Sequence, residues 1–184
     1  MKTRGKTRIV TRILVCIAVI CVLILAFYIS LLASAPGLNI EQKHQVRKAV
    51  ALIREKGFTD EALLLEHLTA FRADDNWLNS SVPKENAYAA TNFPFAIMTL
   101  YSDFFTYPSD DVERAAILLH EARHLKGNDE KDAYEFVWRN RKILGWTREE
   151  YLDSPVWVNV RRQTREEAPQ LFTCPENEFG DCTE

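Results

Sequence analysis

The strongest feature of the hydrophobic pattern is an uninterrupted apolar stretch close to the N-terminus. Residues 13–35 carry no charge, and 14 of these 23 positions are Leu, Ile, Val or Phe. As a helix this stretch would measure about 34 Å, against about 30 Å for the hydrocarbon layer of a bilayer. Its apolar side chains would favour insertion by about 6 kcal/mol. The pattern therefore predicts a transmembrane helix over residues 13–35.

The residues on either side of this stretch predict its orientation. Residues 1–12 contain five basic side chains and no acidic one, so we expect them in the cytoplasm. Residues 36–184 would then form an extracytoplasmic domain, either periplasmic or extracellular. The alternative is a cleavable signal peptide, because Ala33-Ser34-Ala35 has the small-x-small form of a cleavage site. The anchor is favoured, since the apolar run exceeds the usual signal core and Pro36 follows the candidate site.

Beyond the apolar stretch, the pattern predicts a mainly helical domain. Asn39 can cap a helix that continues to about Lys56, where Gly57 would end it. Residues 112–125 are apolar around most of the helical circumference, which is typical of a helix inside the fold. Further helices are expected from Thr59 to about Phe71, from Asp129 to about Trp138, and after Ser154-Pro155.

Two segments do not follow the helical pattern. Residues 73–94 are rich in Asp, Asn, Ser and Pro and predict a long connection, either a packed structural loop or a lid over a site. Residues 95–105 are apolar and aromatic without helical spacing, which predicts one strand or extended segment. The predicted fold class is therefore mainly α, and α+β at most, with a short edge strand.

The charge of the domain restricts its partners. Five of the 23 basic residues lie within residues 1–12, which leaves 18 basic against 26 acidic side chains in residues 36–184, a net charge near −8. A nucleic-acid-binding or anionic-lipid-binding domain would be expected to have a basic face, so neither partner is predicted. The remaining 149 residues suffice for one domain with its own hydrophobic core.

The candidate chemistry lies inside the apolar helix, as His120-Glu121-Ala-Arg-His124. A step of four residues places the two histidines on one face of a helix, one above the other. Neutral imidazoles are common zinc ligands, and Glu121, rotated by about 100°, would reach a metal-bound water without binding the metal. The alternative is a pair of core histidines satisfied by local hydrogen bonds.

A third zinc ligand is expected from the helix that follows. Gly127 is placed to end the first helix, so the start of the next would fold back over that end. Glu130 is the preferred ligand, and Glu135 is the alternative. Asp129 and Asp132 are expected to be helix-start charges or partners that orient an imidazole N–H. Any one member of this acidic cluster could also belong simply to a solvated helix N-terminus.

The segment His120-Glu-x-x-His124-x-x-Gly127-x-x-Glu130 resembles the elongated metzincin signature of the zincin-type zinc metallopeptidases, with Glu where that group has His. Glu130-x-x-Ala133-Tyr134 resembles the gluzincin habit of taking the third ligand from the following helix. The wider stretch, from about residue 97 to Tyr134, is similar to the aspzincin and lysine-specific endopeptidase-like group. The chain departs from these patterns, because no methionine follows Met98 to form a Met-turn and the aspzincin Asp is displaced or replaced by Glu130.

The resemblance implies a zincin-like helical domain and a membrane-anchored peptidase that acts on peptides or proteins. In that reading Zn²⁺ is held by His120, His124 and Glu130, and Glu121 is the general base. Tyr134 is the candidate donor to the oxyanion, with Tyr101 and Tyr107 behind it. A non-catalytic zincin-like binding or regulatory module is the alternative function. An anchored helical interaction protein without metal is the third.

The cysteines divide between two environments. Cys16 and Cys21 lie in the predicted transmembrane helix and are expected to be small apolar residues there. Cys174 and Cys182 lie in the acidic C-terminal tail, and an oxidising exterior would let them pair. Such a disulfide would stabilise mainly the tail, by about 2–3 kcal/mol.

Overall fold

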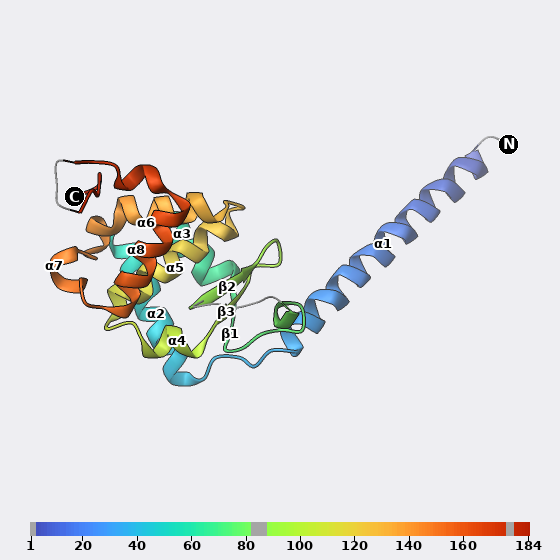
Figure 1. Ribbon diagram of the computed structural model, residues 1–184. Coiled ribbons are helices and arrows are strands. Elements are labelled where there is room, and N and C mark those ends of the chain that lie inside the picture. The colour runs from blue at the N-terminus through green and yellow to red at the C-terminus, as the bar shows by residue number, and fades with distance from the viewer. Residues whose placement is uncertain (1–2, 82–87, 176–178) are drawn as a thin grey trace.

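The computed structural model describes residues 3–81, 88–175 and 179–184 and confirms a mainly helical fold with one small sheet. A long helix, α1 (Thr3–Ala33), projects from the domain formed by the later residues (Figure 1). The sheet lies on the side of the domain from which this helix leaves (Figure 1). Within α1, the segment Arg8–Ala33 is long and apolar enough to cross a membrane, as the hydrophobic pattern predicts.

The end of α1 is packed onto the domain. Leu31 is fully buried, and the Arg72 Nε–H donates to the Leu32 carbonyl at 3.3 Å. The Ala73 N–H donates to the Pro36 carbonyl at 2.9 Å, and Gly37 forms an isolated antiparallel bridge with Arg72. The connection between α1 and the domain is therefore part of the folded structure.

The helices of the domain begin and end largely where local signals predict. Asn39 caps α2 (Ile40–Glu55) in a capping box with Gln42, and Gly57 follows with a φ of 92°. Ser154 caps α8 (Pro155–Glu167), whose first position is the predicted proline. The remaining helical elements are α3 (Thr59–Leu63), the π-helical turn η1 (Leu64–Leu68), the 3₁₀ turns η2 (Asn79–Ser81) and η3 (Pro169–Phe172), α4 (Ser102–Thr106), α5 (Asp111–Leu125), α6 (Glu130–Leu144) and α7 (Arg148–Tyr151).

The sheet differs in detail from the prediction. Its strands are β1 (Ala70–Arg72), β2 (Ala89–Asn92) and β3 (Ile97–Leu100), in the order β1-β3-β2. The strand expected within residues 95–105 is present as β3, but it is the central strand, parallel to β1 and antiparallel to β2. The edge strand on the side of α5 is β2, which lies in the segment predicted as a connection. Residues 82–87 of that segment lie outside the described residues.

The core is built around α5. This helix packs against α2, α6 and β2, and its central residues from Ala115 to Leu119 are buried. Trp138, Trp146 and Trp157 form a cluster beside it, with ring centroids 5.0–6.1 Å apart. A helix surrounded on all sides holds its polar side chains in fixed positions, and α5 carries the histidines of the candidate site.

The C-terminal tail is bound to α6. A disulfide joins Cys174 and Cys182. Arg141 of α6 is almost fully buried and forms ion pairs with Asp181 at 3.1 Å and with Glu184 at 2.8 Å. A buried guanidinium is costly without such partners, so these tail residues stabilise the domain.

Candidate metal centre

The two elements that form the site are joined by a tight turn. The side chain of Asp110 accepts hydrogen bonds from the first turn of α5, and Gly127, with a φ of 80°, follows the end of that helix. Asp129 caps α6 by accepting from the Asp132 N–H at 2.9 Å. Glu130 is the first residue of α6, so its side chain lies close to the last turn of α5. The predicted hairpin of two helices is present.

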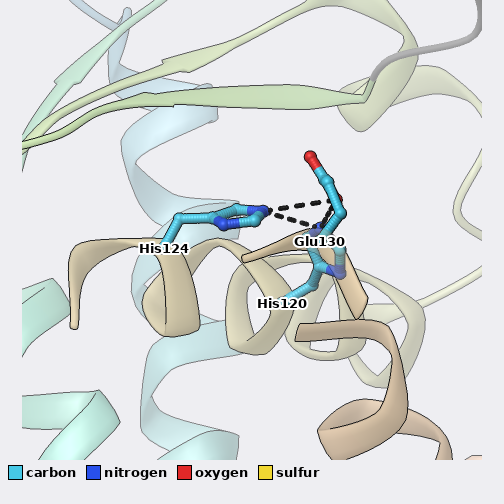
Figure 2. Close-up of side chains that lie close together, drawn as sticks. All are labelled: His120, His124 and Glu130. Atoms are coloured by element: carbon cyan, nitrogen blue, oxygen red, sulfur yellow. Dashed lines mark hydrogen bonds and ion pairs between the residues drawn. The ribbon is translucent and has the colours of Figure 1, made fainter. Parts of the chain in front are cut away.

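Three side chains converge at this hairpin. The Nε2 atoms of His120 and His124 lie 3.1 Å apart. The Oε2 atom of Glu130 lies 3.2 Å from His120 Nε2 and 3.4 Å from His124 Nε2. Figure 2 shows both rings and the carboxylate pointing toward one another. Among the residues that the structure describes, these three form the group whose side chains could hold a metal ion.

The three distances fit a zinc site. At tetrahedral zinc, with bonds of about 2.0–2.1 Å, neighbouring ligand atoms lie about 3.3–3.4 Å apart. The observed separations of 3.1, 3.2 and 3.4 Å are close to that value. Two facing Nε2 atoms are satisfied either by one shared proton or by a cation bound to both. Two histidines and one glutamate are also a ligand set of catalytic zinc sites, which keep a fourth position open.

The outer nitrogens of the two rings are in different environments. His124 Nδ1 lies 3.0 Å from the Asn128 carbonyl oxygen, and a proton on Nδ1 would leave Nε2 as the electron-pair donor. His120 Nδ1 is buried and lacks a hydrogen-bond partner within the described part of the chain. The ring of His120 instead contacts the ring of Tyr134, with centroids 4.3 Å apart. His124 is thus oriented by a hydrogen bond and His120 by packing.

His124 and Glu130 each stabilise the charged form of the other. Burial by itself would lower the pKa of His124, but hydrogen bonds to Glu130 and to the Asn128 carbonyl outweigh it and raise that pKa to about 9. Hydrogen bonds from both histidines hold the pKa of the Glu130 carboxyl well below its usual range. Glu130 therefore stays ionised at neutral pH, as a carboxylate ligand must be.

Glu121 lies next to the three converging side chains without joining them. Its side chain is 6% exposed, and its Oε2 accepts a hydrogen bond from the Thr91 hydroxyl of β2 at 2.6 Å. The sequence predicts that Glu121 is rotated off the face shared by the two histidines, near enough to reach a metal-bound water, and in the structure its carboxylate is held by Thr91 outside the group of three. It does not predict the contact with Thr91, because residues 73–94 carry no strand signal.

A cavity of about 380 Å³ opens beside the candidate ligands. It lies between β2, α5, α6 and α8, with Ala116, Ile117, Val137 and Val160 among its apolar lining residues. His120, Glu121, Glu130 and Tyr134 line it as well, together with Gln163, Glu166 and Glu167 of α8. Burial raises the pKa of Tyr134, which keeps its hydroxyl protonated at neutral pH. The cavity thus joins the histidines, a buried carboxylate and a phenol in one space.

Other candidate residues lie elsewhere. Glu135 accepts hydrogen bonds from Arg139 at 2.8 Å and from Gln170 at 2.9 Å, so its carboxylate is directed away from the histidines. The Tyr101 hydroxyl donates to Asp75 at 2.8 Å. The remaining candidate, Tyr107, packs on Tyr88, with ring centroids 6.4 Å apart. Of the three tyrosines considered for an oxyanion donor, the structure brings Tyr134 to the site.

The turn between β2 and β3 reaches the same hairpin. The ring of Phe93 lies over Gly127, 3.7 Å from where a side chain at that position would begin. Phe93 itself is 62% exposed. The β2–β3 turn therefore contacts the residue that links α5 to α6, three positions after His124.

Comparisons of the chain with protein-family models, with curated proteins and with solved structures find no match.

Proposed function

We propose that the chain is a membrane-anchored, zinc-dependent peptidase. The observation that carries this proposal is the convergence of His120 Nε2, His124 Nε2 and Glu130 Oε2 at separations close to those of tetrahedral zinc ligands. The adjoining cavity and the buried Glu121 support hydrolysis, because a structural zinc site needs neither an open space nor a spare carboxylate. The order His-Glu-x-x-His, typical of zinc peptidases, agrees with this assignment.

Each residue has a role that follows from its place. His120, His124 and Glu130 would hold zinc, which supplies Lewis-acid chemistry by lowering the pKa of a bound water and polarising a carbonyl group. Glu121, with one oxygen held by Thr91, accepts a proton as general base and returns it to the leaving amine. Tyr134, still protonated at neutral pH, donates a hydrogen bond to the substrate oxygen on which negative charge develops.

The proposal also places the domain on the extracytoplasmic side of the membrane. The apolar segment Arg8–Ala33 and the basic residues before it support this orientation. Retention of the segment is supported by its packing, because cleavage after Ala35 would remove the fully buried Leu31 and Ser34 Oγ, which accepts from the Trp77 N–H at 3.3 Å. The mass of the mature protein and the accessibility of an epitope at each terminus in intact cells test this placement.

Metal analysis and peptide cleavage test the proposed activity together. We expect about one zinc per purified chain, and cleavage of a peptide mixture that a chelator abolishes and added zinc restores. Zinc at this stoichiometry without cleavage would favour a zincin-like binding or regulatory module instead. A well-folded protein that binds no zinc would contradict both, and would leave an anchored helical interaction protein.

A further inference from the structure

Aromatic residues of the domain gather around the last turns of α1. The ring of Trp77 lies 5.4 Å from the ring of Phe27, edge to face, and the ring of Phe95 lies 5.3 Å from Phe27. The Trp77 indole N–H donates to Ser30 Oγ at 3.1 Å. In Figure 1 the η2 turn, which follows Trp77, lies beside the lower end of α1.

These side-chain contacts are made to residues within the apolar segment Arg8–Ala33. Ser30 and Phe27 precede Ala33, the end of the segment, by three and six residues. At 1.5 Å per residue, Ser30 and Phe27 lie about 5–9 Å from Ala33 along the helix, toward the N-terminus. If α1 crosses a bilayer, Trp77 and Phe95 are therefore at the depth where acyl chains meet headgroups.

The exposed side chains of this region suit that depth. Trp77 is 46% exposed, whereas Trp138, Trp146 and Trp157 are at most 1% exposed. Turns are usually polar, yet the turn between β2 and β3 reads Phe93-Pro-Phe95-Ala, and Phe93 is 62% exposed. An indole combines a large apolar ring with one N–H group, which is why tryptophan is enriched at membrane interfaces.

We propose that Trp77 and the β2–β3 turn are seated in the extracytoplasmic interface of the same bilayer that α1 crosses. The occupant of this surface is zwitterionic lipid at the headgroup–acyl boundary. Asp74, an exposed neighbour of Trp77, and the acidic character of the domain argue against attraction to anionic lipid. The inference rests on the membrane placement of α1 and is independent of zinc and of catalysis.

Fluorescence quenching in vesicles tests this surface. The full chain is reconstituted in phosphatidylcholine vesicles, with or without bromine atoms near the headgroup end of the acyl chains. We expect brominated lipid to quench part of the emission, up to the share of one among four tryptophans. Bromine placed near the terminal methyl groups should quench less. Trp77→Phe should lose the quenchable part of the emission, because it removes the tryptophan that the bromine atoms reach. The phenylalanine keeps the ring contact with Phe27, so the position of the domain on the membrane should not change.

Trp157→Phe is the matched control. The Trp157 indole nitrogen has no hydrogen-bond partner among the residues described, so this change deletes a buried tryptophan without breaking such a bond. It should lower the total emission and leave the quenchable part intact.

Resistance to alkaline extraction is measured on the same vesicles, so that anchoring and seating are separated. If the chain resists extraction but shows no quenching, or shows the same quenching in Trp77→Phe, the proposed position of Trp77 is wrong. The membrane insertion of α1 would still hold. A chain that alkali releases, or that begins after Ala35, overturns the proposal together with the anchor. Zinc content of the same sample reports separately on the proposed activity.

Discussion

The two halves of α5 each bury a glutamate, and their surroundings differ. Glu113, near the start of the helix, is fully buried and accepts hydrogen bonds from Ser109 N at 2.8 Å and Ser109 Oγ at 3.0 Å. It accepts two more, from Trp146 Nε1 at 3.4 Å and from the Ser154 hydroxyl. Glu121, nearer the end, is 6% exposed and has one such donor within the described residues, the Thr91 hydroxyl.

This difference separates a carboxylate that stabilises the fold from one that is available for chemistry. The protein satisfies Glu113 with four donors and leaves it no contact with the cavity beside the histidines. Glu121 faces that cavity and keeps acceptor capacity, since an ionised carboxylate can accept about four hydrogen bonds. Burial of an acidic residue does not indicate function by itself, whereas burial with too few partners beside a cavity does.

The largest expected effect is on metal binding. His124→Ala removes one of the three candidate ligands, and we expect zinc affinity to fall by more than the roughly 10- to 100-fold that loss of an outer partner costs. Glu130→Ala should act in the same direction. Glu135→Ala is the control, because its carboxylate lies with Arg139 and Gln170. Zinc titration of the three variants would contradict the assignment if Glu135→Ala lost zinc and Glu130→Ala kept it.

Glu121→Gln tests the functional half of the comparison. A general base contributes about 10²- to 10⁴-fold, so kcat for peptide cleavage should fall by that factor. Zinc content and melting temperature should stay close to those of the unchanged protein, because Glu121 is not a ligand and the isosteric amide can still accept from Thr91. Undiminished cleavage by a zinc-loaded Glu121→Gln protein would exclude Glu121 as the base.

Zinc binding should release a proton at neutral pH. In the metal-free protein the pKa of His124 is about 9, so its ring is protonated at pH 7 and must lose a proton to bind metal. Apparent affinity should therefore rise about tenfold per pH unit between pH 7 and 9 and then level off. Calorimetry in buffers of different ionisation enthalpy measures the proton count, and an affinity independent of pH over this range would count against the pair with Glu130.

The same raised pKa makes a prediction for folding without metal. A group with a raised pKa stabilises the folded state fully below its unfolded value, here 6.5, and this contribution is lost as the pH rises through about 9. The free energy of unfolding of the metal-free protein should therefore decline across that window. His124→Ala should lack this decline, which denaturant titrations at several pH values would show.

Glu113→Gln tests the structural half. The new amide would direct N–H groups at side chains that themselves donate, so we expect a loss of about 2 kcal/mol in the free energy of unfolding. For a domain of this size, that corresponds to a fall of about 4–8 °C in Tm. Cleavage per folded, zinc-loaded molecule should not change. A large loss of kcat with an unchanged Tm would break the distinction between the two glutamates.

The smallest effect is expected from Thr91→Val, which keeps the shape of the side chain and removes the donor to Glu121. A hydrogen bond to a charged group contributes about 1.5–3 kcal/mol, and a loss at the lower end would reduce kcat about tenfold. KM and zinc content should be nearly unchanged, which separates positioning of the base from substrate binding. Thr99→Val is the control on β3: it removes a buried hydroxyl that accepts from Asn79 at 3.4 Å, outside the cavity lining, so it should leave kcat unchanged.

Features of the fold that depend on nearby residues are predictable from the sequence. The apolar run of α1, the caps at Asn39 and Ser154 and the buried helix α5 are all local patterns, and the structure contains each of them. The spacing Thr147-x-x-Glu150 also predicts a capping box. This prediction is wrong, because the Thr147 side chain makes no cap hydrogen bond to the short helix α7. A capping box satisfies the free N–H groups at the start of a helix, and α7 is a single turn of four residues.

Features that depend on distant pairing are not predictable in this way. β2 reads Ala-Ala-Thr-Asn, which has no apolar alternation and becomes a strand only through its pairing with β3. The Thr91 contact with Glu121 follows from that pairing. The proximity of His120, His124 and Glu130 was predictable because helix spacing and one tight turn bring them together. The role of the Asn128 carbonyl depends on a backbone atom, which no residue pattern reveals.

The β2–β3 turn contacts both α1 and the hairpin that carries the candidate ligands. Phe95 packs on Phe27 of α1, and two residues earlier Phe93 covers Gly127 at the rim of the candidate metal centre. A catalytic centre held by these two contacts would act at a fixed distance from the bilayer surface. Segments of other membrane proteins that emerge beside the bilayer would meet it by lateral diffusion, whereas freely dissolved peptides would have to approach the lipid surface. Distance from the bilayer, counted in residues of the target, would then select the bond to be cut.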